Sequence, residues 1–321
     1  MGPKKTTELS TNKGFLIAVI SAVILSFTSI IIRLVSGDYQ VPALIIAFWR
    51  NFFVVSCALP VFLIFHPKLL IIKKKDIPFL FLFGVSLCVF NILWTLAVTL
   101  MGASVATVLV YSSGAFTAIL GYFLLRESLG AKKIIAVILC LVGCLFVSGA
   151  TNPGAWEANT LGIITGLSSG LLYAVYSLMG RQATHRGLNP WTTLFYTFMF
   201  AGSFLLMINL LPIDFIPATA SHPAEMIMLG TQWRGWLLLL ILAAGPTLIG
   251  FGLYNVSLGL LDSSTANLIL TLEPVFTMIT AYFLLHERLA SLEIFGAGLI
   301  LLGLLILRLR KKPKVPLQKP I

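Results

Sequence analysis

The chain has 321 residues, of which 58% are hydrophobic and 10% charged, and its formal net charge is +11. Soluble domains contain about 45–50% apolar and about 25% charged residues, so this composition excludes an ordinary soluble protein. It also excludes a disordered chain, which lacks apolar residues in such numbers. The sequence therefore predicts a polytopic membrane protein.

Ten apolar stretches follow one another along the chain, each close to the roughly 20 residues that a helix needs to cross the hydrocarbon core. These predicted spans are 14–35, 42–65, 77–99, 102–125, 131–149, 160–180, 190–211, 235–259, 263–285 and 291–309. The alternating pattern of a membrane β-barrel is absent from the sequence. We therefore expect an all-α integral membrane protein with ten transmembrane helices, because helices satisfy their own backbone groups in lipid.

The basic residues indicate how the spans are oriented. If the N-terminus is placed inside, most of the 22 lysines and arginines fall in the cytoplasmic loops or at the helix ends beside them, as the positive-inside rule requires. Both termini are then expected in the cytoplasm, with the chain in the inner (plasma) membrane. The basic tail 308–319 is expected to contact anionic lipid headgroups, which explains the net charge without nucleic acid.

An internal repeat is visible at a shift of 160 residues, which lays 115–129 over 275–289 without a gap. A shift of 148 residues likewise pairs Ser29 with Ser177 and Arg33 with Arg181. Each half contains five predicted helices, an odd number, so the second half should enter the membrane in the opposite sense. Such an inverted repeat is a recurrent transporter architecture, and the alternative is a duplication without moving parts, as in some channels.

Segment 272–289, with the sequence LEPVFTMITAYFLLHERL, resembles the signature of the EamA family within the drug/metabolite transporter superfamily. The first-half copy, ending at 123–129, resembles it as well, but Gly114 stands where the second copy has Pro274. The resemblance implies two EamA-type five-helix repeats: one in 1–150, and one in 151–321 that also carries the basic tail. It further implies a secondary transporter, commonly an exporter of amino acids or related metabolites, although some relatives import.

Arg50 and Glu273 lie well inside predicted spans, where charge is costly and usually functional. The Arg50 guanidinium could bind a substrate carboxylate through two hydrogen bonds, or it could form a structural ion pair or reach the outer interface. Glu273, immediately before Pro274, could bind an ammonium group or exchange a proton, or it could simply be the buried partner of Arg50. Glu127 and Glu287 end the fourth and ninth helices, where we expect hairpin-corner bonds to backbone N–H groups or a neighbouring arginine.

Polar and aromatic residues within the spans are candidates for the lining of a substrate cavity. They are Trp49, Asn91, Trp94, Tyr111, Tyr173, Tyr176, Tyr254, Asn255 and Asn267. Asn91 and Trp94 are three residues apart and so share a helix face. The alternative for the aromatic residues is core or lipid packing, and for the asparagines it is an interhelical hydrogen bond.

Small residues indicate close packing in one helix and a bend in another. The sixth span carries a double GxxxG pattern that predicts close helix packing or a homodimer, at Gly162, Gly166 and Gly170. The eighth span is weakened by residues that predict either a hinge or a static kink, namely Gly245, Pro246, Gly250 and Gly252.

The leading hypothesis is a secondary transporter that exports an amino acid or a related charged compound by alternating access. Its expected partners are the small-molecule substrate and membrane lipid. We expect no enzyme activity, metal or cofactor, because HExxH and paired aspartates are absent. We expect no nucleotide-driven pump, because the GxxxxGK[ST] phosphate loop is absent. The four cysteines lie within spans and are interpreted as packing residues. The alternatives are an importer or exchanger of the same fold, or a channel or helper subunit without transport activity of its own.

Overall fold

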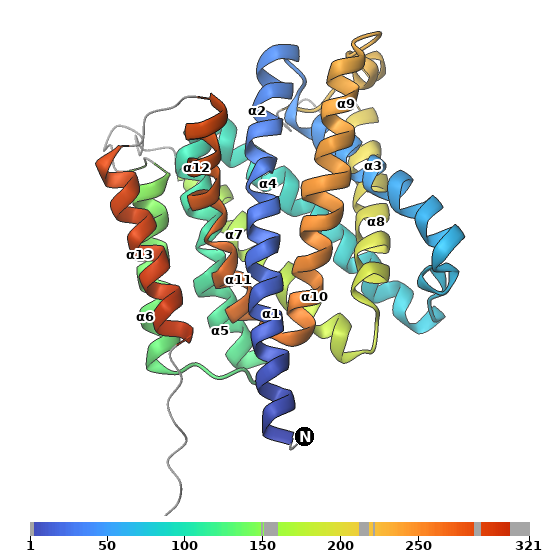
Figure 1. The fold of residues 1–321 in the computed structure, drawn as a ribbon. Helices are drawn as coiled ribbons and strands as arrows, with labels where there is room; N and C mark the ends of the chain where they lie inside the picture. The colour runs from blue at the N-terminus through green and yellow to red at the C-terminus, as the bar shows by residue number, and fades with distance from the viewer. Residues whose placement is uncertain are drawn as a thin grey trace, which may run out of the picture.

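The computed structural model describes residues 3–148, 150, 160–211, 218–220, 222–285 and 290–308, and the side chains of these residues apart from 3–10, 102–104 and 285. Within these residues the chain forms helices joined by short turns, and no strand occurs among them. The helices stand side by side as a bundle (Figure 1). Glu287, the tail beyond Arg308 and the connection 151–159 between the predicted repeats lie outside the described residues.

The first half contains six α-helices and two short 3-10 turns. They are α1 (Pro3–Leu25), α2 (Phe27–Tyr39), α3 (Ala43–Phe65), η1 (Pro67–Leu70), η2 (Lys74–Asp76), α4 (Ile77–Tyr111), α5 (Ser113–Leu125) and α6 (Ala131–Val147). The first predicted span is divided into α1 and α2 at Ser26, whose hydroxyl donates to the Val23 carbonyl oxygen at 2.6 Å. Side-chain bonds of this kind bend helices.

The second half repeats the pattern with a long, irregular eighth span. Its elements are α7 (Thr160–His185), α8 (Pro190–Leu210), η4 (Pro223–Ile227), α9 (Trp233–Leu242), the π-helix η5 (Ala243–Phe251), α10 (Gly252–Leu260), α11 (Ser263–Leu270), α12 (Glu273–Leu285) and α13 (Ser291–Arg308). The helix boundaries α4/α5 and α11/α12 fall at equivalent places, because α5 and α12 each have 13 residues and begin 160 residues apart (273 − 113).

Nine segments of the described chain are long and apolar enough to cross a membrane. Large apolar side chains cover their outer surface: Phe123 is 71% exposed and its repeat counterpart Phe283 is 69% exposed, as expected of lipid-facing positions. The protein is therefore a multi-pass membrane protein. The remaining predicted span corresponds to α6, whose 17 residues lie at the lower end of the crossing range of about 17–25, so ten spans stay a prediction.

The predicted boundary between the third and fourth spans, at 100–101, lies within the single helix α4. Membrane-length segments Lys74–Met101 and Val105–Leu125 meet inside α4, and the helix assignment is interrupted only at Ser112.

The glycine stripe of α7 packs against α4 within the same chain. A Cβ atom on Gly162 would meet Met101, whereas Cβ atoms on Gly166 and Gly170 would meet Leu109. The prediction of close packing is therefore confirmed. Since this face is occupied by α4, it is not free for a second copy, and the homodimer stays a prediction that the stripe no longer supports.

The eighth span contains the π-helix η5, which includes Pro246. Proline has no N–H to donate, and π segments commonly mark bends. Helix α1 contacts this segment through a hydrogen bond, in which the Ser21 hydroxyl donates to the Gly250 carbonyl oxygen at 2.8 Å. The predicted irregularity is confirmed, while its action as a hinge stays a prediction.

The helices α6 and α13 lie against each other at one side of the bundle (Figure 1). A Cβ atom on Gly143 of α6 would lie 2.7 Å from the Gly296 carbonyl oxygen, and one on Gly303 of α13 would lie 3.1 Å from the Ala136 carbonyl oxygen. These two contacts are equivalent at the shift of 160 residues (303 − 143 and 296 − 136). The glycines allow the two backbones to approach closely.

Replacing Gly143 by alanine tests this close approach. The added methyl group would overlap the Gly296 carbonyl oxygen, so we expect a loss of roughly 1–3 kcal/mol of stability, measured as a lower Tm in detergent. Gly298→Ala on α13 is the matched control, because nothing lies within 4 Å of a Cβ atom there. An equal Tm for the two variants would contradict the described packing.

Candidate substrate-binding site

A cavity of about 610 Å³ lies between helices of the two halves. Its lining includes Ser36 near the end of α2, Ser148 just after α6, and Glu293 in the first turn of α13. Figure 1 shows these helix ends at the end of the bundle opposite the N-terminus. The cavity therefore extends from the interior of the bundle to that opposite end.

Arg50 of α3 reaches the cavity beside Asn91 of α4. An Arg50 Nη2 hydrogen is donated to Asn91 Oδ1 at 2.8 Å, and Asn91 Nδ2 donates to the Leu87 carbonyl oxygen at 2.8 Å. The second bond fixes the orientation of the amide, so its oxygen faces the guanidinium. Arg50 Nε is buried without a hydrogen-bond partner, which leaves unused donor capacity on this side chain.

Glu273 is the first residue of α12 and lines the same cavity. The helix begins here because Pro274 has a fixed φ suited to a first turn and no N–H that would need a partner. An acid at this place also interacts favourably with the helix dipole. The Tyr111 hydroxyl is hydrogen-bonded to the Glu273 carboxylate, and Arg50 attracts that carboxylate electrostatically. The two membrane-depth charges thus face one shared space.

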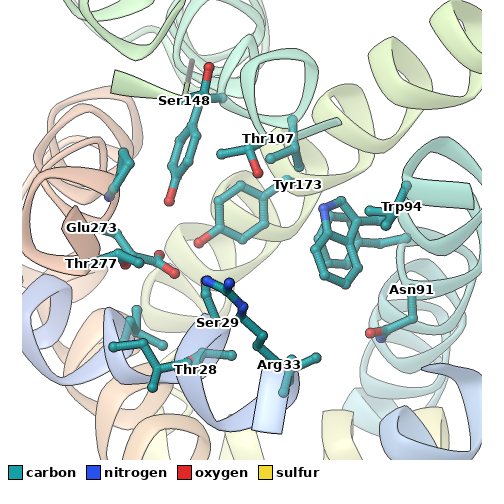
Figure 2. Close-up of a pocket in the computed structure, with 18 of the residues that line it drawn as sticks. Thr28, Ser29, Arg33, Asn91, Trp94, Thr107, Ser148, Tyr173, Glu273 and Thr277 are labelled. Atoms are coloured by element: carbon teal, nitrogen blue, oxygen red, sulfur yellow. The ribbon is translucent and has the colours of Figure 1, made fainter. Parts of the chain in front are cut away.

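Aromatic side chains form a wall of the cavity. Phe90 of α4 and Tyr173 of α7 stack with ring centroids 5.4 Å apart. Figure 2 shows Tyr173 between Glu273 on one side and Trp94 on the other, with the side chain of Arg33 extending toward the same space. The cavity therefore combines charged groups with flat apolar surfaces, as binding sites for small amphipathic molecules do.

Six of the eleven candidate residues from the sequence line this cavity. They are Arg50, Asn91, Trp94, Tyr111, Tyr173 and Glu273. They come from four helices, α3, α4, α7 and α12, that are far apart in the sequence. The fold brings them together around the acidic start of α12.

The other five candidates lie outside the cavity lining. Trp49 packs edge-to-face against Trp236 at 4.8 Å, and its ring N–H donates to the Met226 carbonyl oxygen at 2.6 Å. The rest are buried between helices, with exposed fractions of 0–2%, and they are Tyr176, Tyr254, Asn255 and Asn267. The Tyr176 and Tyr254 rings stack in parallel with centroids 6.4 Å apart.

Sequence reasoning missed the residues that α2 contributes. Ser29 and Arg33 line the cavity and are exposed, although neither is among the candidates that the sequence indicates. A signal was present, because both residues recur in the second half at a shift of 148 as Ser177 and Arg181. The repetition of a serine and an arginine within apolar spans distinguishes these positions in the sequence.

Glu127 performs the predicted corner role. Its carboxylate is buried and accepts hydrogen bonds from the backbone N–H groups of Ser263 at 2.6 Å and Ser264 at 3.3 Å. The two serine hydroxyls donate to the same carboxylate at 2.7 and 2.9 Å. A residue of the first half therefore caps the N-terminus of α11 in the second half. Glu287 lies outside the described residues, so its corner role stays a prediction.

The sequence profile of the EamA-like transporter family matches residues 12–149 and 160–309. An uncharacterized transporter of Synechocystis is 25% identical over 228 residues, which cover 71% of this chain and 65%, just under two thirds, of that protein. A probable amino-acid metabolite efflux pump of Escherichia coli is 25% identical over 320 residues, covering 95% of this chain and 99% of that protein. A solved crystal structure aligns with a TM-score of 0.75 at 15% identity, over 92% of this chain and 96% of that one, which shows a common fold.

The bond between Arg50 and Asn91 can be tested by a double-mutant cycle. Asn91→Leu leaves the partly buried guanidinium without its amide partner, so we expect a loss of about 1–3 kcal/mol of stability, measured by thermal unfolding in detergent. The double variant Arg50→Met with Asn91→Leu removes both partners and should be more stable than the sum of the two single losses implies. Strictly additive losses would mean that the bond contributes nothing.

Proposed function

This chain belongs to the EamA-like transporter family, and on that premise we propose that it is a secondary carrier that exports an amino acid or a related charged metabolite by alternating access. The family name and the names of the relatives point to transport and not to catalysis. The protein is expected to use a small-molecule substrate within a lipid environment.

One observation supports the substrate class above all others: Arg50 and Glu273 carry opposite charges on the lining of one cavity inside membrane-spanning helices. Charges at this depth are costly and are retained mainly for function. Arg50 would bind a substrate carboxylate through its planar donors, and Glu273 would bind an ammonium group or exchange a proton. An amino acid carries both complementary groups.

The size and walls of the cavity suit such a substrate. Its volume of about 610 Å³ lies within the range of about 300–1,000 Å³ found for small-molecule sites. The rings of Phe90, Trp94 and Tyr173 offer flat surfaces against which the apolar part of a metabolite can pack. The charged groups would fix its orientation.

The proposed mechanism requires two inverted five-helix repeats. It therefore also requires α6 to cross the membrane, which brings the nine membrane-length segments to ten spans. Support comes from the matching starts of α5 and α12 and from the reciprocal glycine contacts of α6 and α13. Broken helices near the middle of the membrane, in equivalent places of two repeats, are typical of transporter binding sites. Exchange of conformation between the two halves would open the cavity to alternate sides.

The proposed direction rests on charge and on one relative. Figure 1 shows α3 running from the end opposite the N-terminus toward the N-terminal side. It is followed by the turns η1 and η2, which contain Lys68, Lys74 and Lys75. By the positive-inside rule the N-terminal end would face the cytoplasm and the cavity would face outward across the inner membrane. The Escherichia coli relative is named an efflux pump, which favours export over import.

Counterflow in proteoliposomes tests the function and the role of Arg50. Vesicles loaded with a metabolite mixture should exchange a carboxylate-bearing substrate saturably, with the exchanged compound identified by mass spectrometry. Arg50→Lys keeps the positive charge but loses the planar guanidinium that can donate two hydrogen bonds to one carboxylate. The KM of the variant for the carboxylate substrate should therefore rise about tenfold, equivalent to about 1.4 kcal/mol. An amine analogue without the carboxylate should be unaffected.

Two results would count against this proposal. Unsaturable flux, or no flux of any compound, would favour a channel or a helper subunit. If Arg50→Lys lowers expression while the purified protein exchanges normally, the guanidinium is structural. Arg234→Lys serves as the matched control, because Arg234 stacks on Trp233 with its guanidinium carbon 5.6 Å from the ring centroid and does not line the cavity.

Glu273→Gln tests proton coupling. Glutamine keeps the shape and polarity of the side chain but cannot release a proton, so the exchange rate should no longer respond to pH where the wild-type rate does, while folding is retained. Asp38→Asn is the control, since Asp38 is an exposed carboxylate outside the cavity lining. A pH profile identical to that of the wild type would remove Glu273 from proton coupling.

A further inference from the structure

A chain of hydrogen-bonded polar side chains lies between the helices outside the cavity. The Ser113 hydroxyl donates to Asn267 Oδ1 at 3.2 Å, and Asn267 Nδ2 donates to the Ser177 oxygen at 3.0 Å. The Ser177 and Tyr254 hydroxyls are 2.6 Å apart. All four residues are 0–1% exposed, and they connect α5, α7, α10 and α11 across the two halves.

Three members of this chain, together with Arg181, are the repeat counterparts of residues that line the cavity. At the shift of 160 residues, Ser113 corresponds to Glu273 and Thr107 to Asn267 (273 − 113 and 267 − 107). At the shift of 148 residues, Ser29 corresponds to Ser177 and Arg33 to Arg181 (177 − 29 and 181 − 33). Every cavity-side member of these four pairs lines the cavity.

The two members of each pair differ in their exposure. Ser29 is exposed and Glu273 is half-buried, whereas their counterparts Ser177 and Ser113 are fully buried at 0%. Thr107 is half-buried, and its counterpart Asn267 is 1% exposed. The cavity-side positions are therefore accessible, whereas their counterparts Ser113, Asn267 and Ser177, here called the closed set, are buried and hydrogen-bonded to one another.

A polar clamp lies beyond the closed set. It consists of Glu127 and Lys133 from the first half and of Asp262, Ser263 and Ser264 at the start of α11. Glu127 binds both serines as described above, and Lys133 Nζ donates to Asp262 Oδ2 at 3.3 Å and to Ser264 Oγ at 2.8 Å. Glu127 lies in the corner between α5 and α6, and Lys133 lies in the first turn of α6. Figure 1 shows this corner at the same end as the N-terminus.

We propose that Ser113, Ser177 and Asn267 form a second substrate-contact site, the closed counterpart of the cavity, and that it opens toward the N-terminal end when the clamp on α11 is released. The inference rests on the proposed function, because it requires the two halves to exchange conformations. The site presents hydroxyl and amide groups, with a serine in place of the Glu273 carboxylate. It therefore offers neutral hydrogen-bonding partners to the polar groups of the same small charged metabolite.

The clamp explains why this site is closed in the present conformation. Four hydrogen bonds to one buried carboxylate hold α11 against the corner that follows α5. Gly121 allows this approach, because a Cβ atom there would lie 2.8 Å from Glu127 Oε2. Release of the carboxylate would free the N-terminus of α11, which carries Asn267, from the first half.

Cysteine labelling from each side of the membrane tests the second site. The background replaces the four native cysteines, Cys57, Cys88, Cys140 and Cys144, and carries either Ser29→Cys or Ser177→Cys. A membrane-impermeant, charged methanethiosulfonate should modify Ser29→Cys from the cavity side and leave Ser177→Cys unmodified from both sides. Adding Glu127→Gln should raise labelling of Ser177→Cys from the N-terminal side at least tenfold and slow that of Ser29→Cys.

The test depends on whether labelling of Ser177→Cys rises while labelling of Ser29→Cys falls. If Ser177→Cys stays unreactive in the Glu127→Gln background while exchange continues, the second site is wrong. If both cysteines react at once from opposite sides, the protein forms an open pore and the inference also fails. Lys133→Gln serves as a second clamp variant should Glu127→Gln fail to fold, and Asp38→Asn, which removes an exposed carboxylate, should leave both labelling rates unchanged.

Failure of the proposed function is distinguishable from failure of the second site. Counterflow in proteoliposomes reports whether any metabolite is exchanged, independently of the labelling. Exchange without reciprocal labelling would retain the carrier and overturn the site. Reciprocal labelling without exchange of any compound in the mixture would retain the two-sided site and overturn the assigned substrate class.

Discussion

A guanidinium and a carboxylate inside membrane-spanning helices require polar surroundings, because an isolated charge in hydrocarbon is costly. Arg50 meets this requirement through Asn91, and Glu273 through Tyr111 and the attraction of Arg50. These partners come from α3, α4 and α12, so the helices must surround a common interior space. The cavity surrounds the two charges, and its aromatic walls are part of the proposed site for a small amphipathic molecule.

Interrupted helices determine where the polar groups lie. The boundary between α4 and α5 follows Ser112, and the boundary between α11 and α12 precedes Glu273, at equivalent positions of the two repeats. A helix that begins inside the bundle directs its free N–H groups and its first side chains into the interior. The first residue of α5 is Ser113, and the first residue of α12 is Glu273. The two halves therefore have similar backbones at this position but different side-chain charge.

The two ends of the bundle differ in how the halves contact each other around the proposed pathway. Toward the end opposite the N-terminus, exposed Ser29 and Arg33 leave the cavity accessible. Toward the N-terminal end, the Glu127 carboxylate caps α11 and holds the two halves together. Charge-assisted hydrogen bonds are strong when buried and are lost once water competes for them. They therefore suit a contact that, in the proposed mechanism, forms in one conformation and breaks in the other.

The sequence by itself determined the membrane class, most of the spans, the internal repeat and the two charges at membrane depth, because hydrophobicity and the cost of buried charge act along the chain. It also indicated Asn91 and Trp94, which share a helix face. Only the tertiary structure decided which candidates share the cavity: Tyr254 and Asn267 are of the same residue types as Tyr173 and Asn91, yet they lie outside its lining. Repeat-equivalent positions have similar local sequences, and their exposure depends on which side the packed halves leave open.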